Sequence, residues 1–474
     1  MGKFCYFCCM IRDFIEKTIL RHFPFEPTEQ QSVLINELAD FLTSVQREKV
    51  FLLKGYAGTG KTSVVGALVK AILELKQKTF LLAPTGRAAK VLSSYSGFPA
   101  FTIHKKIYRQ KSLGDFRFGL ADNLHTDTIF IVDEASMIAN RGGENEFGSG
   151  FLLDDLISYV YQGDGCSLIL LGDTAQLPPV SEEESPALNK LVLEGFGLQC
   201  EEFLLTNVVR QALESGILYN ATLLRQALAD ELTSAMPKLK ITGFKDIQPL
   251  SGTDLIDEVQ RSYDGAGVQD TIIITRSNYR TNIYNNGIRG RVMMKEEEIC
   301  NGDLLMITRN NYFWNKPYKE IEFIANGDIV EVVRVRKSRE MYGFRFVDLT
   351  LKSLDFNWEI DARIWLDCLQ SENPAQTSEL NKKLFAAVEE DYADITIKRE
   401  RYKQMFENEY LNALQVKFAY AVTCHKAQGG QWKKVFVDMG MSPDTLIDRS
   451  YYRWLYTALT RATENVFLVN YISK

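Results

Sequence analysis

Apolar runs alternate with segments of helical periodicity through the first half of the chain. The strand-like runs lie at residues 50–53, 79–83, 128–132 and 167–171. Most are separated by segments whose apolar positions recur every three or four residues, as in residues 63–75. Strands that alternate with helices in this way predict a parallel sheet with helices on both faces.

Two helical patterns precede the first strand. Residues 11–20 place apolar side chains at helical spacing, and Pro24 ends that pattern. A second helix is expected from Pro27, with Thr28 as its N-cap. We expect the first residues of the chain to be frayed, with Met10 as a candidate natural start.

A second α/β block begins near Phe203 and contains no further glycine-rich phosphate loop. Its expected helices and strands are 217–229, 254–263, 271–275, 435–437 and 466–469. Residues 301–411 differ, because short strands with Asn-Gly-Asp turns predict a small antiparallel barrel. Residues 377–414 within and after it are charged and helix-prone.

Residues 105–127 interrupt the first block with a polar and aromatic stretch. A turn signal at 112–115 separates Tyr108 from Phe116 and Phe118, which favours a small hairpin insertion. An ordinary surface loop is the alternative.

Composition limits the class of protein. The 474 residues are too many for one core, and 46% hydrophobic with 24% charged residues is typical of a globular protein in water. The net charge of −6 argues against a protein coated in basic surface, but leaves a local basic channel open. No apolar run approaches the roughly 18 residues that span a bilayer, so we expect no membrane partner.

The eight cysteines are sparse for a chain of this length. Their scatter fits buried thiols in a reducing compartment and favours a cytoplasmic location. A metal site at Cys5, Cys8 and Cys9 is disfavoured because a matching second pair of ligands is missing.

The sequence GYAGTGKT, residues 55–62, lies between a strand-like run and a helix, which is the context that a phosphate-binding loop requires. Its glycines let backbone N–H groups turn towards a phosphate, and the helix N-terminus adds donors and a positive dipole end. Lys61 can reach the β- and γ-phosphates, and the Thr62 hydroxyl can ligate Mg²⁺. The expected contacts to ATP are Gly55, Gly58, Thr59, Gly60, Lys61, Thr62 and Ser63.

An acidic pair follows the strand at 128–132. Asp133 can hold Mg²⁺, and Glu134 can orient and deprotonate the attacking water. The segment LLGDTAQLPPV follows the next strand and would place Asp173 and Gln176 near the γ-phosphate.

The order of these motifs resembles the superfamily-1 helicases, and among them the RecD-like group that moves 5′ to 3′. The resemblance covers nearly all of residues 28–470. Further motifs carry it: Gln31 in TEQQ, APTGRAAKVL at 83–92, TIHK at 102–105, VVRQ at 208–211 around Arg210, AVTCHKAQGGQW at 421–432 and YTALTRA at 456–462.

The resemblance implies a role for each matched position. Gln31 would read adenine, while Arg210 and Arg461 would act as arginine fingers on the γ-phosphate. The implied DNA contacts are Thr85, Arg87, Thr102, His104, Lys105, Thr423 and His425. Phe116 and Phe118 would form the pin that separates the strands at a fork.

The fingers have a physical reason. A γ-phosphoryl group gains charge on its equatorial oxygens during transfer, and arginine is permanently charged and binds phosphate in a bidentate fork. The chain departs from the family pattern after Gln428-Gly429. The family often has an acidic residue there, whereas this chain has Gly430 and Gln431. Gln431 can hydrogen-bond a ribose but carries no charge, which leaves sugar discrimination open.

We therefore expect an α/β protein with two RecA-like parallel-sheet domains that bind ATP and Mg²⁺ between them. The expected divisions are 1–27 for an N-terminal helix, 28–104 and 128–202 for the first domain, 105–127 for the hairpin, 203–300 and 412–474 for the second domain, and 301–411 for the barrel and helical insertion. The expected activity is that of an ATP-dependent DNA helicase, which we expect to be a monomer and to act on single-stranded and fork DNA.

Three alternatives remain open at this point. The chain could be an RNA helicase or ribonucleoprotein remodeller of the same superfamily. It could be an ATP-gated scaffold that binds nucleic acid without unwinding it. It could also be a subunit of a nuclease complex, although no compact carboxylate cluster indicates a nuclease in this chain.

Overall fold

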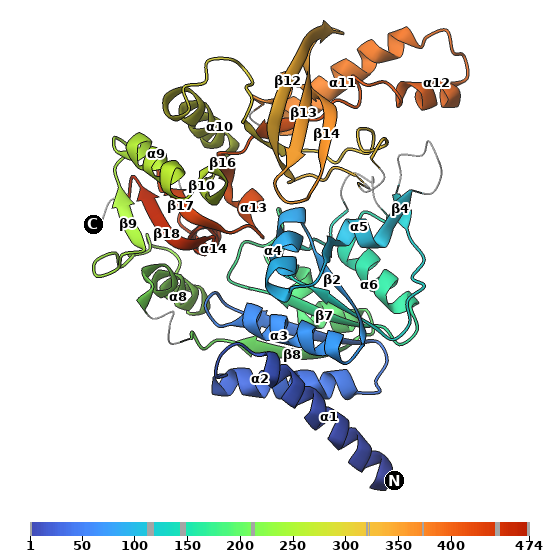
Figure 1. Cartoon of the computed structure of the whole chain (residues 1–474), viewed down its shortest axis with the longest axis vertical. Helices are drawn as coiled ribbons and strands as arrows, with labels where there is room; N and C mark the ends of the chain where they lie inside the picture. Colours follow the sequence, from blue (N-terminus) through green and yellow to red (C-terminus); the bar gives the residue numbers. More distant parts are fainter. Residues whose placement is uncertain are drawn as a thin grey trace.

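Two parallel α/β domains and one antiparallel module make up the molecule (Figure 1). The structure is a computed structural model that describes residues 2–110, 118–142, 148–209, 214–318, 321, 323–371, 374–440 and 446–471. The expected α/β class with two parallel sheets is confirmed. No helix among these residues is both long and apolar enough to cross a bilayer.

The first domain contains a six-stranded sheet in the order β3-β2-β6-β7-β1-β8, in which every pairing is parallel. Its strands are β1 (Lys49–Gly55), β2 (Lys78–Ala83), β3 (Ala100–Thr102), β6 (Thr128–Val132), β7 (Ser167–Gly172) and β8 (Gln199–Leu205). The four strands at the centre are the four that the apolar runs predict. The sheet extends to Leu205, so the domain boundary expected at residue 202 falls inside β8 and is wrong.

Alternation along the central strands explains why their whole length is apolar. Phe51 and Leu53 pack against helices on one face, whereas Val50 and Leu52 pack into a separate core on the other face. Both faces are therefore buried, as expected for a parallel sheet. The helices of this domain are α1 (Gly2–His22), α2 (Glu29–Thr43), α3 (Lys61–Glu74), α4 (Gly86–Ser96), α5 (Ile103–Ile107), α6 (Leu152–Gln162) and α7 (Lys190–Gly195).

The N-terminus differs from the expected frayed start. Helix α1 begins at Gly2, and Ile15 and Ile19 bury their side chains in the first core. The side chains of Cys5, Cys8 and Cys9 lie outside the described part of the structure. Helix α2 begins as expected, because Thr28 and Gln31 form a reciprocal capping box.

The insertion in the first domain is an antiparallel hairpin of β4 (Tyr108–Gln110) and β5 (Phe118–Leu120). Residues 111–117, which include the expected turn and Phe116, lie outside the described residues. The hairpin begins later than residue 105, because Lys105 belongs to α5, whose N-cap Thr102 accepts a hydrogen bond from the Lys105 backbone N–H at 3.1 Å.

The second domain has a five-stranded parallel sheet in the order β16-β10-β17-β18-β9. Its strands are β9 (Ile247–Leu250), β10 (Thr271–Thr275), β16 (Ala421–Thr423), β17 (Trp432–Asp438) and β18 (Ala462–Val469). Its helices are α8 (Gly216–Ala229), α9 (Leu255–Gly265), α10 (Asn278–Gly287), the π-helical η5 (Ile288–Val292), α13 (Cys424–Ala427) and α14 (Arg449–Leu459). Among the described residues, short 3₁₀ turns lie at Ala135–Met137, Pro186–Leu188, Val268–Asp270 and Leu366–Cys368.

The antiparallel module is a five-stranded sheet in the order β14-β13-β12-β11-β15. Its elements are β11 (Leu304–Ile307), β12 (Ile329–Met341), β13 (Phe344–Ser353), β14 (Glu359–Trp365), β15 (Val416–Phe418), α11 (Pro374–Asp391) and α12 (Lys398–Met405). A bridge between Ile364 and Leu414 joins the two ends of the sheet, as in a small barrel. The boundary expected at residue 411 is wrong, because the chain pairs with β11 through Phe418 before it re-enters the second domain.

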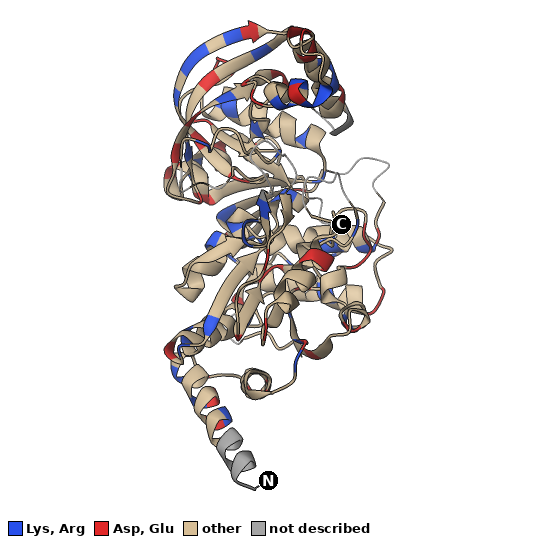
Figure 2. Ribbon diagram, turned by 90° about the vertical axis from the view of Figure 1, so that its right-hand side faces the viewer, with Lys and Arg blue, Asp and Glu red and all other residues tan. Residues whose placement is uncertain are grey.

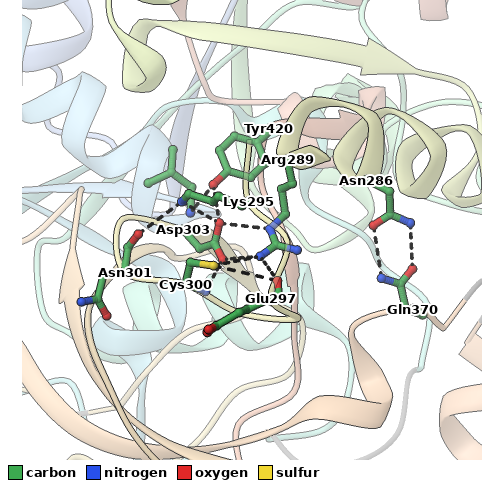
Figure 3. A network of polar contacts seen from close by, with 10 residues as sticks. Asn286, Arg289, Lys295, Glu297, Cys300, Asn301, Asp303, Gln370 and Tyr420 are labelled. Carbon is green, nitrogen blue, oxygen red and sulfur yellow. Dashed lines mark hydrogen bonds and ion pairs between the residues drawn. The ribbon is translucent and has the colours of Figure 1, made fainter. Parts of the chain in front are cut away.

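A buried ion-pair network fixes this module to the second domain (Figure 3). The fully buried carboxylate of Asp303, next to β11, accepts hydrogen bonds from Arg289 of η5, from Lys295 and from the Tyr420 hydroxyl. Burial alone would raise the pKa of Asp303, but the bonds from Arg289 and Lys295 outweigh it and hold the pKa below its ordinary value. The chain leaves the second domain at Asp303 and returns at Tyr420, so this network ties both connections together.

We predict that Asp303→Asn destabilises the protein by about 3–5 kcal/mol at neutral pH, because it leaves Arg289 buried without a charged partner. Because the pKa of Asp303 is lower in the folded than in the unfolded protein, its ionised carboxylate stabilises the fold at pH values above the unfolded pKa of about 3.9. This stabilisation is lost as the pH falls through the pKa of the folded protein. Urea unfolding followed by circular dichroism measures both effects. Asp361→Asn is the control, because Asp361 is half exposed in its pair with Arg336 and should cost about 1 kcal/mol or less. Equal unfolding midpoints for the two variants would contradict the prediction.

Candidate functional site

The glycine-rich loop joins β1 to α3 at the carboxyl edge of the first sheet. Gly58 and Gly60 have φ values of +75° and +80°, which favour glycine. A Cβ at Gly60 would lie 2.3 Å from Nε2 of Gln31, so the position also lacks room for a side chain. Lys61 begins α3, and its Nζ donates to the carbonyl of Gly55 at 3.3 Å. The loop therefore has the backbone shape that the sequence motif predicts.

Gln31 supports this loop from α2. Its Nε2 donates to the Thr59 carbonyl at 3.0 Å, and its Oε1 accepts from the Thr28 backbone N–H at 2.9 Å. Gln31 and Thr59 are both buried. The structure thus places Gln31, the expected adenine contact, against the phosphate loop. Its side-chain amide already forms hydrogen bonds to Thr59 and Thr28 within the protein.

The acidic pair lies directly after β6. Asp133 accepts from the Glu134 backbone N–H at 2.8 Å through Oδ1 and from the Tyr95 hydroxyl at 2.6 Å through Oδ2. Glu134 has a φ of +52°, a conformation that non-glycine residues rarely adopt and that clusters at functional sites. Burial raises the pKa of Glu134, Arg461 opposes this effect, and the neighbouring Asp133 adds to it.

Arg461 reaches this pair from the second domain. It follows α14, is almost fully buried, and its Nη1 lies 3.7 Å from Oε1 of Glu134. Its Nε donates to the carbonyl of Thr457 at 3.1 Å, which fixes the guanidinium in the direction of the first domain. The other expected finger, Arg210, lies outside the described residues.

Tyr456 forms a second link between the domains. Its hydroxyl donates to Oδ2 of Asp173 at 2.5 Å and accepts from the backbone N–H of Ala57 in the phosphate loop at 2.9 Å. Burial raises the pKa of Asp173, while Lys61 and the Tyr456 hydroxyl oppose the rise. A single side chain of α14 thus touches both the phosphate loop and the segment after β7.

The segment after β7 makes further contacts with the second domain. The Leu177 backbone N–H donates to Oγ1 of Thr457 at 2.9 Å, and Nε2 of Gln428 donates to the Leu177 carbonyl at 2.7 Å. Gln176 is buried beside them, and its Oε1 has no hydrogen-bond partner in the described part of the chain. The structure therefore brings Gln176 to the same interface as Arg461.

A cavity of about 1310 Å³ lies between the two domains at this point. Its lining includes Gly58, Gly60, Lys61, Thr62, Asp133, Glu134, Asp173 and Gln176 of the first domain and Gln431 and Arg461 of the second. Gln31, Gly55, Thr59, Ser63 and Gly430, which are also expected nucleotide contacts, lie outside this lining. The Thr62 hydroxyl and the Asp133 carboxylate are hard oxygen donors in one cavity, which fits the donor preference of Mg²⁺.

The expected DNA contacts occupy equivalent places in the two domains. Thr102 is the N-cap of α5 after β3, and Thr423 is the N-cap of α13 after β16, each strand being at the edge of its sheet. Thr85 caps α4 after β2 by accepting from the Ala88 backbone N–H at 3.2 Å. Threonines thus follow strand ends in both sheets, and Figure 2 shows Lys and Arg segments where its upper and lower halves meet.

The two histidines differ in environment. Burial lowers the pKa of His104 to about 4, so its imidazole is neutral at physiological pH. His425 is exposed, and partial desolvation lowers its pKa as well. Both can offer a neutral imidazole to a nucleic acid, but neither supplies a positive charge at neutral pH.

Arg87 lies between the domains rather than on an open surface. Its guanidinium stacks over the Trp432 ring at 4.2 Å and donates to the Gln431 carbonyl at 3.3 Å. Lys105 lies 5.9 Å from the centroid of Phe101. The expected cationic DNA contacts are therefore partly engaged within the protein.

Phe118 of the hairpin packs against the antiparallel module. Its ring centroid lies 4.2 Å from that of Tyr312, and the side chain is half-buried. The structure thus shows a contact that connects the first domain to the module inserted in the second. Phe116 lies outside the described residues.

Several site residues escape prediction from the sequence. Tyr456, Thr457 and Gln428 lie inside motifs that the sequence analysis recognises, so their motif membership was an available signal. Tyr95 lies 38 residues from Asp133 and in no recognised motif. Only the fold brings it to the site.

Two family models match the chain in succession. An AAA domain matches residues 28–240, and a UvrD-like helicase C-terminal domain matches residues 418–469. The first match covers the phosphate loop and the acidic pair, and the second covers Gln428, Tyr456 and Arg461.

Curated relatives extend over most of the chain. The uncharacterized protein R530 of Acanthamoeba polyphaga mimivirus is 24% identical over 92% of this chain and 98% of its own length. The ATP-dependent RecD2 DNA helicase of Deinococcus radiodurans is 25% identical over 93% of this chain and 50% of its own length. The ATP-dependent DNA helicase dda of Enterobacteria phage T4 is 22% identical over 88% of this chain and 93% of its own length. This chain thus spans nearly all of two of these relatives and half of the third.

Solved structures with a similar chain path include a Pif1 helicase from Bacteroides in complex with ADP-AlF3 and ssDNA. It has 17% sequence identity and a TM-score of 0.47, and the match covers 94% of this chain and 93% of that chain.

We predict that Glu134→Gln binds ATP but hydrolyses it very slowly, because the amide fills the same space and cannot accept a proton. In the unchanged protein Glu134 must be deprotonated to act as the base. Because its pKa is raised above the ordinary value of 4.5, we expect the hydrolysis rate to begin to fall on acidification at a pH above 4.5. Single-turnover hydrolysis between pH 5 and pH 8, with nucleotide binding measured in parallel, checks both parts. Native turnover by the glutamine variant would show that Glu134 is not the base.

Proposed function

We propose that this chain, which belongs to the superfamily-1 helicases of the RecD and Pif1 type, uses ATP hydrolysis to move 5′ to 3′ along single-stranded DNA and to unwind a duplex at a fork. The observation that carries this proposal is the approach of Arg461 from the second domain to Glu134 of the first, at 3.7 Å across a shared cavity. A site built from two domains can close on ATP and open after hydrolysis, which is what a motor requires.

The residues of the cavity divide the chemistry between them. The loop N–H groups and Lys61 bind the phosphates, and Glu134 takes a proton from the attacking water. Arg461, and by resemblance Arg210, would stabilise the charge that develops on the γ-phosphoryl oxygens. Thr62 and Asp133 would hold Mg²⁺, which when bound neutralises phosphate charge.

The single strand would lie across the strand ends that carry Thr85, Thr102 and Thr423. Hydroxyl and cationic groups at such positions bind phosphates without reading sequence. Gly430 and Gln431 would border the nucleotide sugar. The scattered free thiols among the described residues, as at Cys166 and Cys424, favour a reducing cytoplasmic setting.

An RNA helicase is the second candidate, because the hydroxyls of Thr85, Thr102 and Thr423 at these strand ends can bind the phosphates of either nucleic acid. ATPase stimulation by poly-dT and by poly-U separates the two: we expect the larger stimulation with poly-dT. An ATP-gated scaffold would show stimulation without strand displacement.

Strand displacement on duplexes with a 5′ or a 3′ single-stranded tail tests the function and the direction together. We expect ATP-dependent displacement with the 5′ tail, with Lys61→Ala as the inactive control. Displacement from the 3′ tail alone would overturn the direction, and no displacement from either would overturn the helicase proposal.

We predict that Phe118→Ala keeps ATPase stimulation by single-stranded DNA and loses most duplex unwinding. Loss of a stacked aromatic costs about 1–3 kcal/mol per base, which is comparable to one base-pair step. ATPase and fork unwinding are measured on the same preparation. Native unwinding would remove the pin role, and joint loss of both activities would assign Phe118 to packing against Tyr312.

A further inference from the structure

Helix α4 ends on the acidic pair of the catalytic site. The Tyr95 hydroxyl, in its last turn, donates to Oδ2 of Asp133 at 2.6 Å. With the Glu134 backbone N–H on the other oxygen, the Asp133 carboxylate is held from two sides. A carboxylate oxygen has more than one lone pair, so these bonds leave room for a metal or its water.

The other end of α4 lies at the expected path of the single strand. Thr85 caps the helix there, ten residues before Tyr95, which corresponds to about 15 Å of helix at 1.5 Å per residue. The far end is pressed closely onto α3: a Cβ at Gly66 would lie 3.2 Å from the Tyr95 carbonyl oxygen. Helix α3 begins at Lys61, so α4 rests on the element that carries the phosphate-binding lysine.

Side chains between these ends contact the rest of the molecule. Arg87 stacks on Trp432 of the second domain. Lys90 donates to the Leu354 carbonyl and lies 3.5 Å from the buried carboxylate of Asp355, both in the antiparallel module. Figure 1 shows α4 on the side of the first domain that faces these parts. Any change in the position of the second domain or its module is therefore transmitted to α4.

We propose that Tyr95 is a positioning residue that couples single-strand binding at the start of α4 to the carboxylate that holds Mg²⁺. The inference rests on the proposed function, in which Asp133 binds the metal and Thr85 and Arg87 contact the strand. A short helix moves as a unit, so a strand bound at Thr85 changes how firmly Tyr95 holds Asp133. Groups that orient a metal ligand typically change metal affinity or activity by about 10- to 100-fold when removed.

Tyr95→Phe tests this role, because it removes the hydroxyl and keeps the ring that packs beside Gly66. Tyr161→Phe is the matched control: its hydroxyl also donates a hydrogen bond within the first domain, but to the main-chain carbonyl of Lys49 at 2.8 Å, away from the cavity. Mn²⁺ serves as the metal probe, and its affinity for the protein–ADP complex is measured by electron paramagnetic resonance with and without an oligo-dT strand. Thermal unfolding midpoints and ATPase stimulation by oligo-dT are measured for all three proteins.

We expect Tyr95→Phe to bind Mn²⁺ about 10-fold more weakly and to lose most of its ATPase stimulation by oligo-dT, whereas Tyr161→Phe behaves as the unchanged protein. Unchanged Mn²⁺ affinity and unchanged stimulation in a folded Tyr95→Phe variant would overturn the inference. Weaker Mn²⁺ binding with native stimulation would overturn the coupling. If the unchanged protein itself shows no stimulation by oligo-dT, the proposed function fails, and the Mn²⁺ affinities without DNA still decide whether Tyr95 positions Asp133.

Discussion

The approach of Arg461 to Glu134 across the cleft is the contact on which the arrangement of this molecule depends. It exists only while the second domain lies against the first, because each residue belongs to a different sheet. The link from Tyr456 to Ala57 and Asp173 has the same property. In the proposed function the γ-phosphate lies among these groups, so the free energy of binding ATP and the free energy of closing the cleft are linked quantities.

Other contacts determine which parts of the molecule move together when the cleft opens or closes. The buried Asp303 network ties the antiparallel module to the second domain, so the module follows that domain when the cleft changes. The same module contacts the first domain at α4 through Lys90 and at the hairpin through Phe118. Closure as proposed would therefore act on three places of the first domain at once: Glu134 with Asp133, helix α4 and the hairpin.

Much of the fold and of the catalytic site could be predicted because the required residues are local. Buried parallel strands are apolar throughout, and a phosphate loop needs adjacent glycines, lysine and threonine. The edge strand β8 could not be predicted because its sequence QCEEFLL carries charges on an exposed side, and β3 is three residues long. The end of the barrel at Phe418 was missed because a three-residue strand pairs with β11, which is distant in sequence.

Predictions failed or stayed incomplete where function depends on contacts between distant segments. No spacing rule connects Tyr95 to Asp133 or Phe118 to Tyr312. Likewise the environment of His104, buried enough to lower its pKa to about 4, depends on packing that the motif TIHK does not specify.

The most direct test of the cleft-closure account is the effect of Arg461→Ala on ATP turnover stimulated by single-stranded DNA. An arginine finger acts on charge that develops during phosphoryl transfer, so the account predicts that kcat falls by about 10³- to 10⁵-fold while the dissociation constant of ATP changes far less. A variant that keeps its kcat and loses only ATP affinity would contradict the account.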